Sequence, residues 1–296
     1  MKNKEKSFTF KGSNVLKLGF STQNFLKCLP NDVKNLTEII QYASTEGYEF
    51  IELRDSEASL SLKECKELGK IAESLGVDVL YEINANLLAP GFLAIFKKGL
   101  ENTKAFPGEG IIRTIISNTE FASDETKKGW TEDELKRIIE IAENAGKMAH
   151  EHNLKFIVEN GNESFFGKGK EYFGFADLLD KTKNIGLQFD TANPFQNASR
   201  EKADPLKVEM YLTSIANRWV TTHLKSGKDG VFQPVLNENP LDLGNVISIM
   251  SAKNVKYVAF ELAGHPDKQT CFKNHAESVQ YLINRGLVTK NNRHAR

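Results

Sequence analysis

Four residues of types that bind divalent metal ions recur in the second half of the chain, each at or near the end of a short apolar run. They are Glu159 in LKFIVE, Asp190 in IGLQFD, His223 in WVTTHL and Glu261 in YVAFEL. Carboxylate oxygens with one imidazole nitrogen suit Mn²⁺, Mg²⁺, Co²⁺ or Zn²⁺ better than copper or an iron–sulfur centre. Three carboxylates drawn together would repel one another unless a cation lay between them. The set therefore predicts one divalent-metal site.

Each of these four residues, taken alone, also has a simpler structural interpretation than a metal ligand. A single Glu at a strand end is usually a solvated rim residue, and a lone buried His is more often hydrogen-bonded than ligating. Four such residues at corresponding ends of four consecutive apolar runs are harder to explain in that way. The pattern as a whole favours the metal site.

These side chains can meet only if the runs that carry them are neighbouring parallel strands. Strand-like runs occur at 15–20, 50–53, 77–83, 111–117, 154–159, 185–190, 219–224 and 257–262. Amphipathic, helix-like stretches follow them at 31–47, 61–76, 91–103, 130–152, 173–183, 202–217, 239–253 and 271–285. Strict alternation of strand and helix indicates parallel strands joined by crossover helices, and eight such units fit a closed barrel.

We therefore predict an α/β protein with one domain, a (β/α)8 TIM barrel over residues 16–288. Residues 1–15 are expected to be a lead-in and residues 289–296 a tail. A doubly wound open sheet is the alternative, although its commonest forms use fewer strands. In a barrel of this kind the active site lies at the carboxyl ends of the strands, where the four candidate ligands fall.

Local signals support the helix boundaries. Gly47 and Gly76 stand just beyond two of the predicted helices, where a left-handed C-terminal cap favours glycine. Thr131 and Glu134 have the spacing of a capping box, in which each side chain binds a backbone N–H of the first helical turn.

Composition restricts the class of protein. The 296 residues carry 39 basic and 39 acidic side chains, so the formal net charge is zero, which counts against a nucleic-acid-binding surface. No apolar run approaches the roughly 18 residues that a membrane span needs. The three cysteines, Cys28, Cys65 and Cys271, have neither metal-type nor redox-type spacing. With a polar amino terminus, these features predict a cytoplasmic protein that binds neither membrane nor nucleic acid.

Four segments around the candidate ligands resemble a known family. They are IVEN (157–160), GLQFDTAN (186–193), THLKS (222–226) and FEL (260–262). Over about residues 16–286 the chain looks like the xylose-isomerase-like barrel superfamily, which includes sugar isomerases and epimerases, inosose dehydratase and endonuclease IV. In that family the matching strand ends carry the metal-binding Glu, Asp, His and Glu. The resemblance thus implies the same ligands, Glu159, Asp190, His223 and Glu261.

The resemblance also implies an activity. Relatives that move a proton beside a carbonyl use the first and last metal-binding carboxylates as an acid–base pair, which here are Glu159 and Glu261. The implied function is a metal-dependent sugar isomerase or epimerase of carbohydrate metabolism, acting on a keto- or aldo-sugar through a metal-stabilised enediolate. One divalent ion, such as manganese, is the implied cofactor. A homodimer is expected only by analogy with barrel relatives.

One departure from the family keeps alternatives open. Many relatives have His three residues after the strand-end Asp, where it contacts substrate or a second metal, and this chain has Asn193. A dehydratase or lyase acting on a keto-sugar or inosose needs the same constellation. An endonuclease IV-like phosphodiesterase uses several histidines in a three-zinc cluster, and most of the six histidines present here are poorly placed for one. A non-catalytic barrel with a decayed site is the remaining alternative, against which the complete ligand set argues.

Further residues are expected to contact the substrate at the mouth of the barrel. Lys225 follows His223 by two, so the alternation of a strand places both on one face. The other candidates lie at strand ends or in the loops after them: Glu82, Asn84, Glu163, Asn193 and His265. Each has a simpler interpretation as a rim or packing residue.

Overall fold

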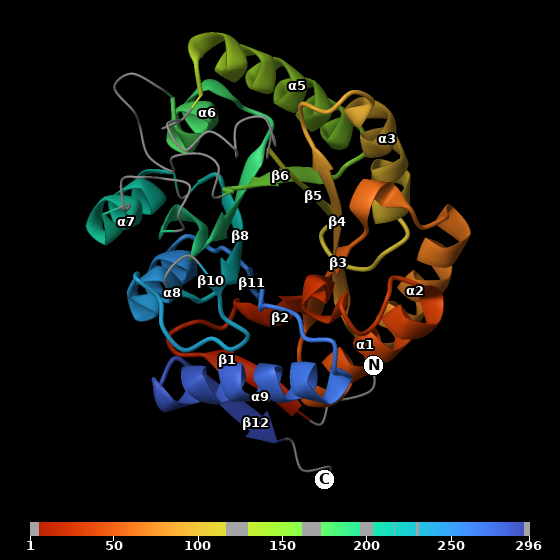
Figure 1. Ribbon diagram of the computed structural model, residues 1–296, viewed down its shortest axis with the longest axis vertical. Coiled ribbons are helices and arrows are strands. Elements are labelled where there is room, and N and C mark those ends of the chain that lie inside the picture. The colour runs from red at the N-terminus through yellow and green to blue at the C-terminus, as the bar shows by residue number, and fades with distance from the viewer. Residues whose placement is uncertain are drawn as a thin grey trace.

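The computed structural model describes residues 6–116, 130–161, 173–195, 204–215, 217–228 and 231–292. Eight parallel strands close into a barrel in the order β11-β2-β3-β4-β5-β6-β7-β8, and β8 pairs with β11 to complete the ring (Figure 1). The strands are β2 (Lys17–Ser21), β3 (Phe50–Arg54), β4 (Asp78–Asn86), β5 (Ile111–Ile115), β6 (Lys155–Glu159), β7 (Gly186–Asp190), β8 (Trp219–Leu224) and β11 (Tyr257–Phe260). The predicted barrel is confirmed, and the open-sheet alternative is not.

Helices surround the barrel, and at least one follows every barrel strand before the next (Figure 1). They are α1 (Val33–Glu46), α2 (Leu62–Leu75), α3 (Phe92–Thr103), α5 (Glu132–Glu151), α6 (Phe175–Lys181), α7 (Pro205–Ser214), α8 (Leu243–Ala252) and α9 (Lys268–Asn284). The apolar faces of these helices pack on the outside of the sheet and form the larger hydrophobic cluster of the molecule.

The predicted caps are present. Gly47 (φ 92°) and Gly76 (φ 65°) end α1 and α2 in the left-handed region. At the start of α5, the backbone N–H of Thr131 donates to Glu134 Oε2 at 2.8 Å, and the N–H of Glu134 donates to Thr131 Oγ1 at 3.3 Å. These local interactions determine where the helices begin and end, and so where the loops leave the barrel.

The interior of the barrel is filled in layers. A separate buried cluster inside the ring consists of Phe50, Leu80, Ile111, Ile157, Tyr257 and Ala259. The rings of Phe50 and Tyr257 meet edge to face, with centroids 5.0 Å apart. Gly19 on β2 makes room for this contact, because a Cβ atom there would lie 2.5 Å from a ring carbon of Phe50. This apolar layer closes the barrel below the position at which the candidate ligands lie.

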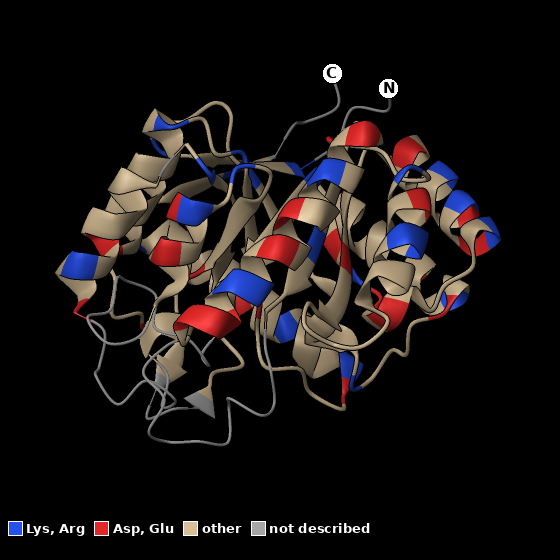
Figure 2. Cartoon of the chain, turned by 90° about the horizontal axis from the view of Figure 1, so that it is seen from above, with Lys and Arg blue, Asp and Glu red and all other residues tan. Residues whose placement is uncertain are grey.

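Charged residues of both signs are interspersed on the outer helices (Figure 2). Paired ions such as Lys155–Glu109 and Lys268–Glu38 lie on this exterior. Among the residues that the structure describes, no helix combines the length and apolarity needed to cross a membrane.

Two small antiparallel sheets add to the barrel, and the sequence patterns did not indicate either. β1 (Lys6–Phe10) and β12 (Val288–Asn292) pair with each other, so the predicted lead-in and tail contain strands. β9 (Gly227–Lys228) and β10 (Val231–Phe232) form a hairpin directly after β8.

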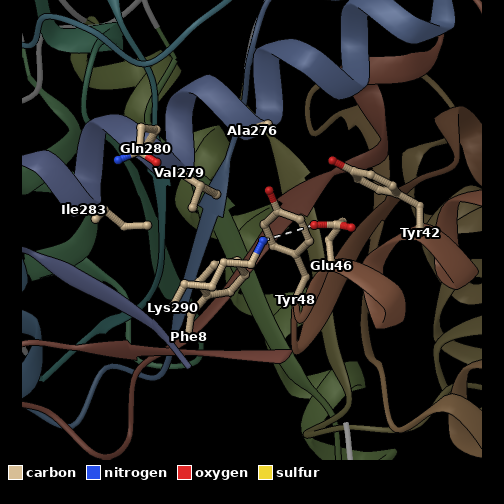
Figure 3. A pocket seen from close by; sticks show the side chains of 9 residues that line it. All are labelled: Phe8, Tyr42, Glu46, Tyr48, Ala276, Val279, Gln280, Ile283 and Lys290. Carbon is tan, nitrogen blue, oxygen red and sulfur yellow. Dashed lines mark hydrogen bonds and ion pairs between the residues drawn. The ribbon is translucent and has the colours of Figure 1, made fainter. Parts of the chain in front are cut away.

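A small pocket of about 170 Å³ lies between the β1–β12 sheet, α1 and α9. Figure 3 shows Glu46 and Lys290 joined across it, with Tyr48 and Tyr42 beside them. Glu46 and Tyr48 precede β3 in the chain, so this pocket belongs to the amino-terminal end of the strands. The candidate ligands lie at the other end.

Candidate metal centre

A layer of polar side chains lies directly above the apolar layer inside the barrel. Its members follow the apolar residues by two positions on the same strands, because alternate residues of a strand face the same side. They are Glu52, Glu82, Arg113, Glu159 and Glu261, joined by Gln188, Asp190 and His223, and all are buried. So many buried charges require partners close at hand.

The four predicted ligands come together in this layer. Each of Glu159, Asp190, His223 and Glu261 offers one donor atom, and these atoms lie within 4.8 Å of one another. His223 Nδ1 is 2.9 Å from Glu159 Oε1, 3.6 Å from Glu261 Oε2 and 3.7 Å from Asp190 Oδ2. One ring nitrogen therefore faces three carboxylates that come from β6, β7 and the residue after β11.

Asp190 shows that this cluster fits a cation. Its Oδ1 accepts hydrogen bonds from the backbone N–H groups of Ala192 and Asn193, both at 2.8 Å. Its Oδ2 is fully buried and faces the cluster; it accepts no hydrogen bond from the residues that the structure describes, and the Lys225 ammonium lies 3.4 Å away. A buried carboxylate oxygen without a donor is costly unless a cation binds it. The oxygen-rich donor set with one nitrogen suits a divalent ion of the Mg, Mn, Co or Zn type.

The orientation of the His223 ring follows from a second carboxylate behind it. Glu52 Oε2 lies 2.8 Å from Nε2, the ring nitrogen that faces away from the cluster. Metal-binding histidines usually donate their other N–H to such a partner, which fixes the tautomer and leaves the ligating nitrogen free.

Arg113 is the largest fully buried side chain of the described barrel, and three acidic residues surround it. Its guanidinium donates to Glu82 and Glu159, and its Nε is 3.6 Å from Glu52 Oε1. These carboxylates raise the pKa of Arg113 despite its burial, so the side chain is a permanent cation below the candidate ligands.

Lys225 lies beside the cluster, on the same face as His223, as predicted. Its Nζ donates to Glu261 and is 3.4 Å from Asp190 Oδ2. The ammonium also stacks on the ring of Phe232 in β10, with Nζ 3.6 Å from the ring centroid. The β9–β10 hairpin therefore contributes an aromatic wall at the edge of the site.

The electrostatics of the layer leave a deficit of positive charge. Counted as ionised, its five carboxylates outnumber by two the cations that the described part of the chain places beside them, Arg54, Arg113 and Lys225. Burial raises the pKa of Glu82 to about 7, although Arg113 and Arg54 act to lower it. Burial acts in the same direction on Glu261, but Lys225 and His223 hold its pKa well below the usual range.

The excess of carboxylates also changes the pKa of His223. Burial alone would lower its pKa, but the carboxylates of Glu52, Glu261 and Glu159 raise it well above the usual value. Binding of a metal through Nδ1 requires that nitrogen to be free of its proton, so proton and metal compete for the same place.

The other residues predicted to contact the substrate lie in different environments. Asn193 is buried, and its amide donates to the backbone oxygen of Asn160 at 2.8 Å, a contact that holds two strand ends together. Glu82 is fully buried and pairs with Arg113 and with Arg54 at 3.4 Å. His265 is exposed, and its Nδ1 accepts from the backbone N–H of Asp267 at 3.0 Å. Glu163 lies outside the described residues.

Asn84 differs from these residues because part of its side chain has no partner. Its backbone is left-handed (φ 41°), and the register between β4 and β5 shifts between Glu82 and Asn86. Its Oδ1 is buried and accepts no hydrogen bond within the described structure. Strained backbone and an unpaired polar atom at the carboxyl end of a barrel strand are typical of a ligand contact.

Reasoning from the sequence missed Arg113 and Gln188, and it gave Glu52 no role. One signal was available: Arg113 interrupts the apolar run IIRTIIS, in which every charged residue must be buried if the run is a barrel strand. Gln188 in IGLQFD is the corresponding polar residue on the next strand but one.

Comparison with known proteins agrees with this geometry. A family model described as xylose isomerase-like TIM barrel matches residues 40–284. Among curated proteins, none matches the chain in sequence.

Solved structures share the fold over nearly the whole chain. A sugar phosphate isomerase/epimerase from Parabacteroides distasonis superposes with a TM-score of 0.66 at 15% identity, covering 95% of this chain and 100% of that one. D-psicose 3-epimerase from Clostridium cellulolyticum, solved with D-tagatose, gives 0.64 at 14% identity, with 92% and 99% covered. A xylose isomerase-like TIM barrel protein from Mycobacterium smegmatis in complex with magnesium gives 0.62 at 14%, with 91% and 97% covered. At such low identity these likenesses show the fold alone.

Proposed function

The chain belongs to the xylose isomerase-like TIM barrel family, and on that premise we propose that it is a divalent-metal-dependent isomerase or epimerase acting on a keto- or aldo-sugar. The observation that carries the proposal is the cluster of Glu159, Asp190, His223 and Glu261 within 4.8 Å at the carboxyl ends of the strands. Structural neighbours that are named as sugar isomerases and epimerases support the same class of substrate.

Glu159 and Glu261 are the proposed acid–base pair. They lie on β6 and directly after β11, strands that are not neighbours in the barrel, so the two carboxylates approach the cluster from different sides. When bound, a divalent ion would supply a Lewis acid that polarises the carbonyl and hydroxyl oxygens of the sugar. One carboxylate then removes the carbon-bound proton, and the other returns a proton to the opposite face or the neighbouring carbon.

Each of these carboxylates has a cationic partner that holds one of its oxygens. Arg113 donates to Glu159 Oε2, and Lys225 donates to Glu261 Oε2. Held in this way, neither carboxylate is free to rotate away from the site. Lys225 also keeps Glu261 ionised, the state that a general base needs at the start of the reaction.

Lys225 and Asn84 are the proposed substrate contacts with the best support. Lys225 already lies between Glu261, Asp190 and the ring of Phe232, where it can donate to a sugar oxygen. Asn84 presents a buried oxygen that has no donor among the described residues, which suits a sugar hydroxyl. A cytoplasmic location, a homodimer and manganese as the native ion stay predictions from the sequence.

The test is exchange of carbon-bound hydrogen with solvent. The wild-type chain, loaded with Mn²⁺, Co²⁺ or Mg²⁺ in D₂O, is incubated with a panel of ketohexoses, ketopentoses, their phosphates and the matching aldoses. We expect deuterium at the carbon beside the carbonyl of at least one sugar, detected by NMR. Glu159→Gln and Glu261→Gln should each lower the rate by about 10²- to 10⁴-fold.

Glu140→Gln is the control, because Glu140 is exposed on α5, outside the barrel, whereas Glu159 and Glu261 are buried inside it. It should exchange at the wild-type rate. A wild-type chain that is fully loaded with metal and exchanges no sugar hydrogen would refute the proposed activity.

A further inference from the structure

We propose that Arg113 is a positioning residue for the metal centre, which fixes two of its four ligands from below: Glu159 directly, and His223 through Gln188 and Glu52. This inference rests on the proposed function in one respect, namely that the four ligands bind a divalent ion. It adds a role for residues that lie outside the ligand set.

Arg113 is placed where an arginine is expensive to bury. It is in the middle of β5, its side chain is 1% exposed, and the layer directly below it is apolar. A guanidinium in such a position requires a partner for each of its edges. The edges are all occupied: Nη1 donates to Glu82, Nη2 to Glu159 and Nε to Gln188 Oε1. A planar fork with three fixed partners has one orientation in the barrel.

The direct branch concerns Glu159. Its Oε2 accepts from Arg113, while its Oε1 lies 2.9 Å from His223 Nδ1 at the centre of the ligand cluster. With one oxygen anchored to a rigid donor, the other must point into the cluster. Arg113 thus separates the two oxygens of this carboxylate into one that is held and one that is available as a ligand.

The indirect branch begins at Gln188. An arginine has no acceptor atom, so the side-chain oxygen of Gln188, and not its nitrogen, must face Arg113 Nε. The amide nitrogen is thereby turned the other way, where it lies 2.8 Å from Glu52 Oε2 and 3.0 Å from His223 Nε2. Arg113 therefore determines which end of the Gln188 amide faces the histidine.

The orientation of Gln188 then constrains His223. The amide NH₂ group of Gln188 only donates, and its hydrogen bond to Glu52 Oε2 at 2.8 Å holds in place the oxygen that faces Nε2. A bare Nε2 would face the lone pairs of Glu52 Oε2 at 2.8 Å, which is repulsive, so the proton stays on Nε2 and is donated to Glu52. With that proton on Nε2, Nδ1 is the nitrogen that can bind a metal, and it is the one that faces the three carboxylates.

A purely structural role for Arg113 makes a different prediction. In that case the guanidinium only neutralises Glu82, Glu52 and Glu159, and any buried cation of similar size would serve. The two roles separate in Arg113→Lys, which keeps the charge but cannot contact Glu82, Glu159 and Gln188 together.

The experiment is a titration of the metal-free full-length chain with Co²⁺, followed by its visible absorption, which reports ligand identity and geometry as well as affinity. The variants are Arg113→Lys, Arg113→Met and, in case these fold poorly, Gln188→Met, which cuts only the indirect branch. Arg218→Met is the matched control. Arg218 donates to the backbone oxygens of Leu179, Thr182 and Ile185, so its loss should lower stability without affecting the centre.

We expect Arg113→Lys and Arg113→Met to bind Co²⁺ at least 10-fold more weakly than wild type, with shifted absorption bands. Gln188→Met should show a smaller loss and a shifted spectrum, and Arg218→Met should match wild type in both. Wild-type affinity and spectrum in Arg113→Lys or in Gln188→Met, beside a wild-type chain that binds Co²⁺, would overturn this inference alone. A wild-type chain that takes up no Co²⁺ would overturn the proposed function, and the inference with it.

Discussion

Glu52 Oε2 lies 2.8 Å from Nε2 of His223, on the side of the imidazole ring opposite the three other candidate ligands. The two residues come from β3 and β8, which do not pair in the barrel, so the contact spans its interior. Glu52 lies two residues after Phe50 and His223 two after Thr221, so the inward positions of both strands carry the pair. It makes a carboxylate–histidine pair of the kind that supports metal ligands in proteins.

Replacing this carboxylate is the first test of the pair. Glu52→Gln preserves the shape of the side chain but removes its charge and lets an amide nitrogen face Nε2. We expect the affinity for Mn²⁺, measured by calorimetry on the metal-free chain, to fall by about 10- to 100-fold. The exposed Glu140→Gln is the control and should bind as wild type does. Equal affinity in the two variants would mean that Glu52 does not support the ligand.

Gly19 tests the packing below the site. A Cβ atom at this position would lie 2.4 Å from the backbone oxygen of Phe50 and 2.5 Å from its ring, and a backbone atom cannot easily move. We therefore expect Gly19→Ala to destabilise the fold by about 1–3 kcal/mol in urea unfolding, although alanine is normally the better strand residue.

Gly244→Ala provides the comparison. The nearest atom to a Cβ there is the side-chain oxygen of Asp242 at 3.2 Å, near the start of α8. This change should alter the free energy of unfolding by less than about 1 kcal/mol. If the two variants were equally stable, the layer inside the barrel would be looser than the structure indicates.

His275 predicts a pH dependence of stability. The residue is buried on α9 among the rings of Phe20, Phe25 and Tyr42, and its Nε2 contacts the amide of Asn24. Burial lowers its pKa from 6.5 to about 3. Between these two values the unfolded chain binds a proton that the folded chain does not, so stability falls as pH falls below 6.5.

The measurement compares wild type with His275→Gln, whose side-chain oxygen can still accept from Asn24. At one pKa unit per about 1.4 kcal/mol, lowering the pH from 6.5 to 5 should cost wild type about 2 kcal/mol more than the variant in urea unfolding. Parallel pH profiles for the two proteins would show that His275 accepts a proton in the folded state.

Much of this architecture could be predicted from the sequence because it depends on local patterns. Alternating strand-like and helix-like runs predicted the barrel. The glycines after two helices and the capping box at Thr131 predicted where helices end or begin. The four candidate ligands were predicted because barrel strands are parallel, so that their carboxyl ends must meet. No contact between residues distant in sequence was needed for these predictions.

The supporting residues could not be assigned in the same way. Arg113 and Glu159 are 46 residues apart, Gln188 and Glu52 are 136 apart, and only closure of the barrel brings them into contact. Asn193 was predicted as a site residue because it stands three positions after Asp190 in the sequence. Its hydrogen bond to Asn160, however, depends on the conformation of the loop. The β1–β12 sheet joins opposite ends of the chain and carries no periodic signal strong enough to indicate it.

The metal content of the purified chain tests the central claim most directly. Wild type and a Glu159→Gln, Glu261→Gln double variant would be analysed for elements side by side, with circular dichroism to show that both are folded. We predict about one Mn, Co, Mg or Zn per wild-type chain, bound as isolated or after addition, and much less or none in the double variant. A folded wild-type chain that holds no divalent metal and takes none up would contradict the account.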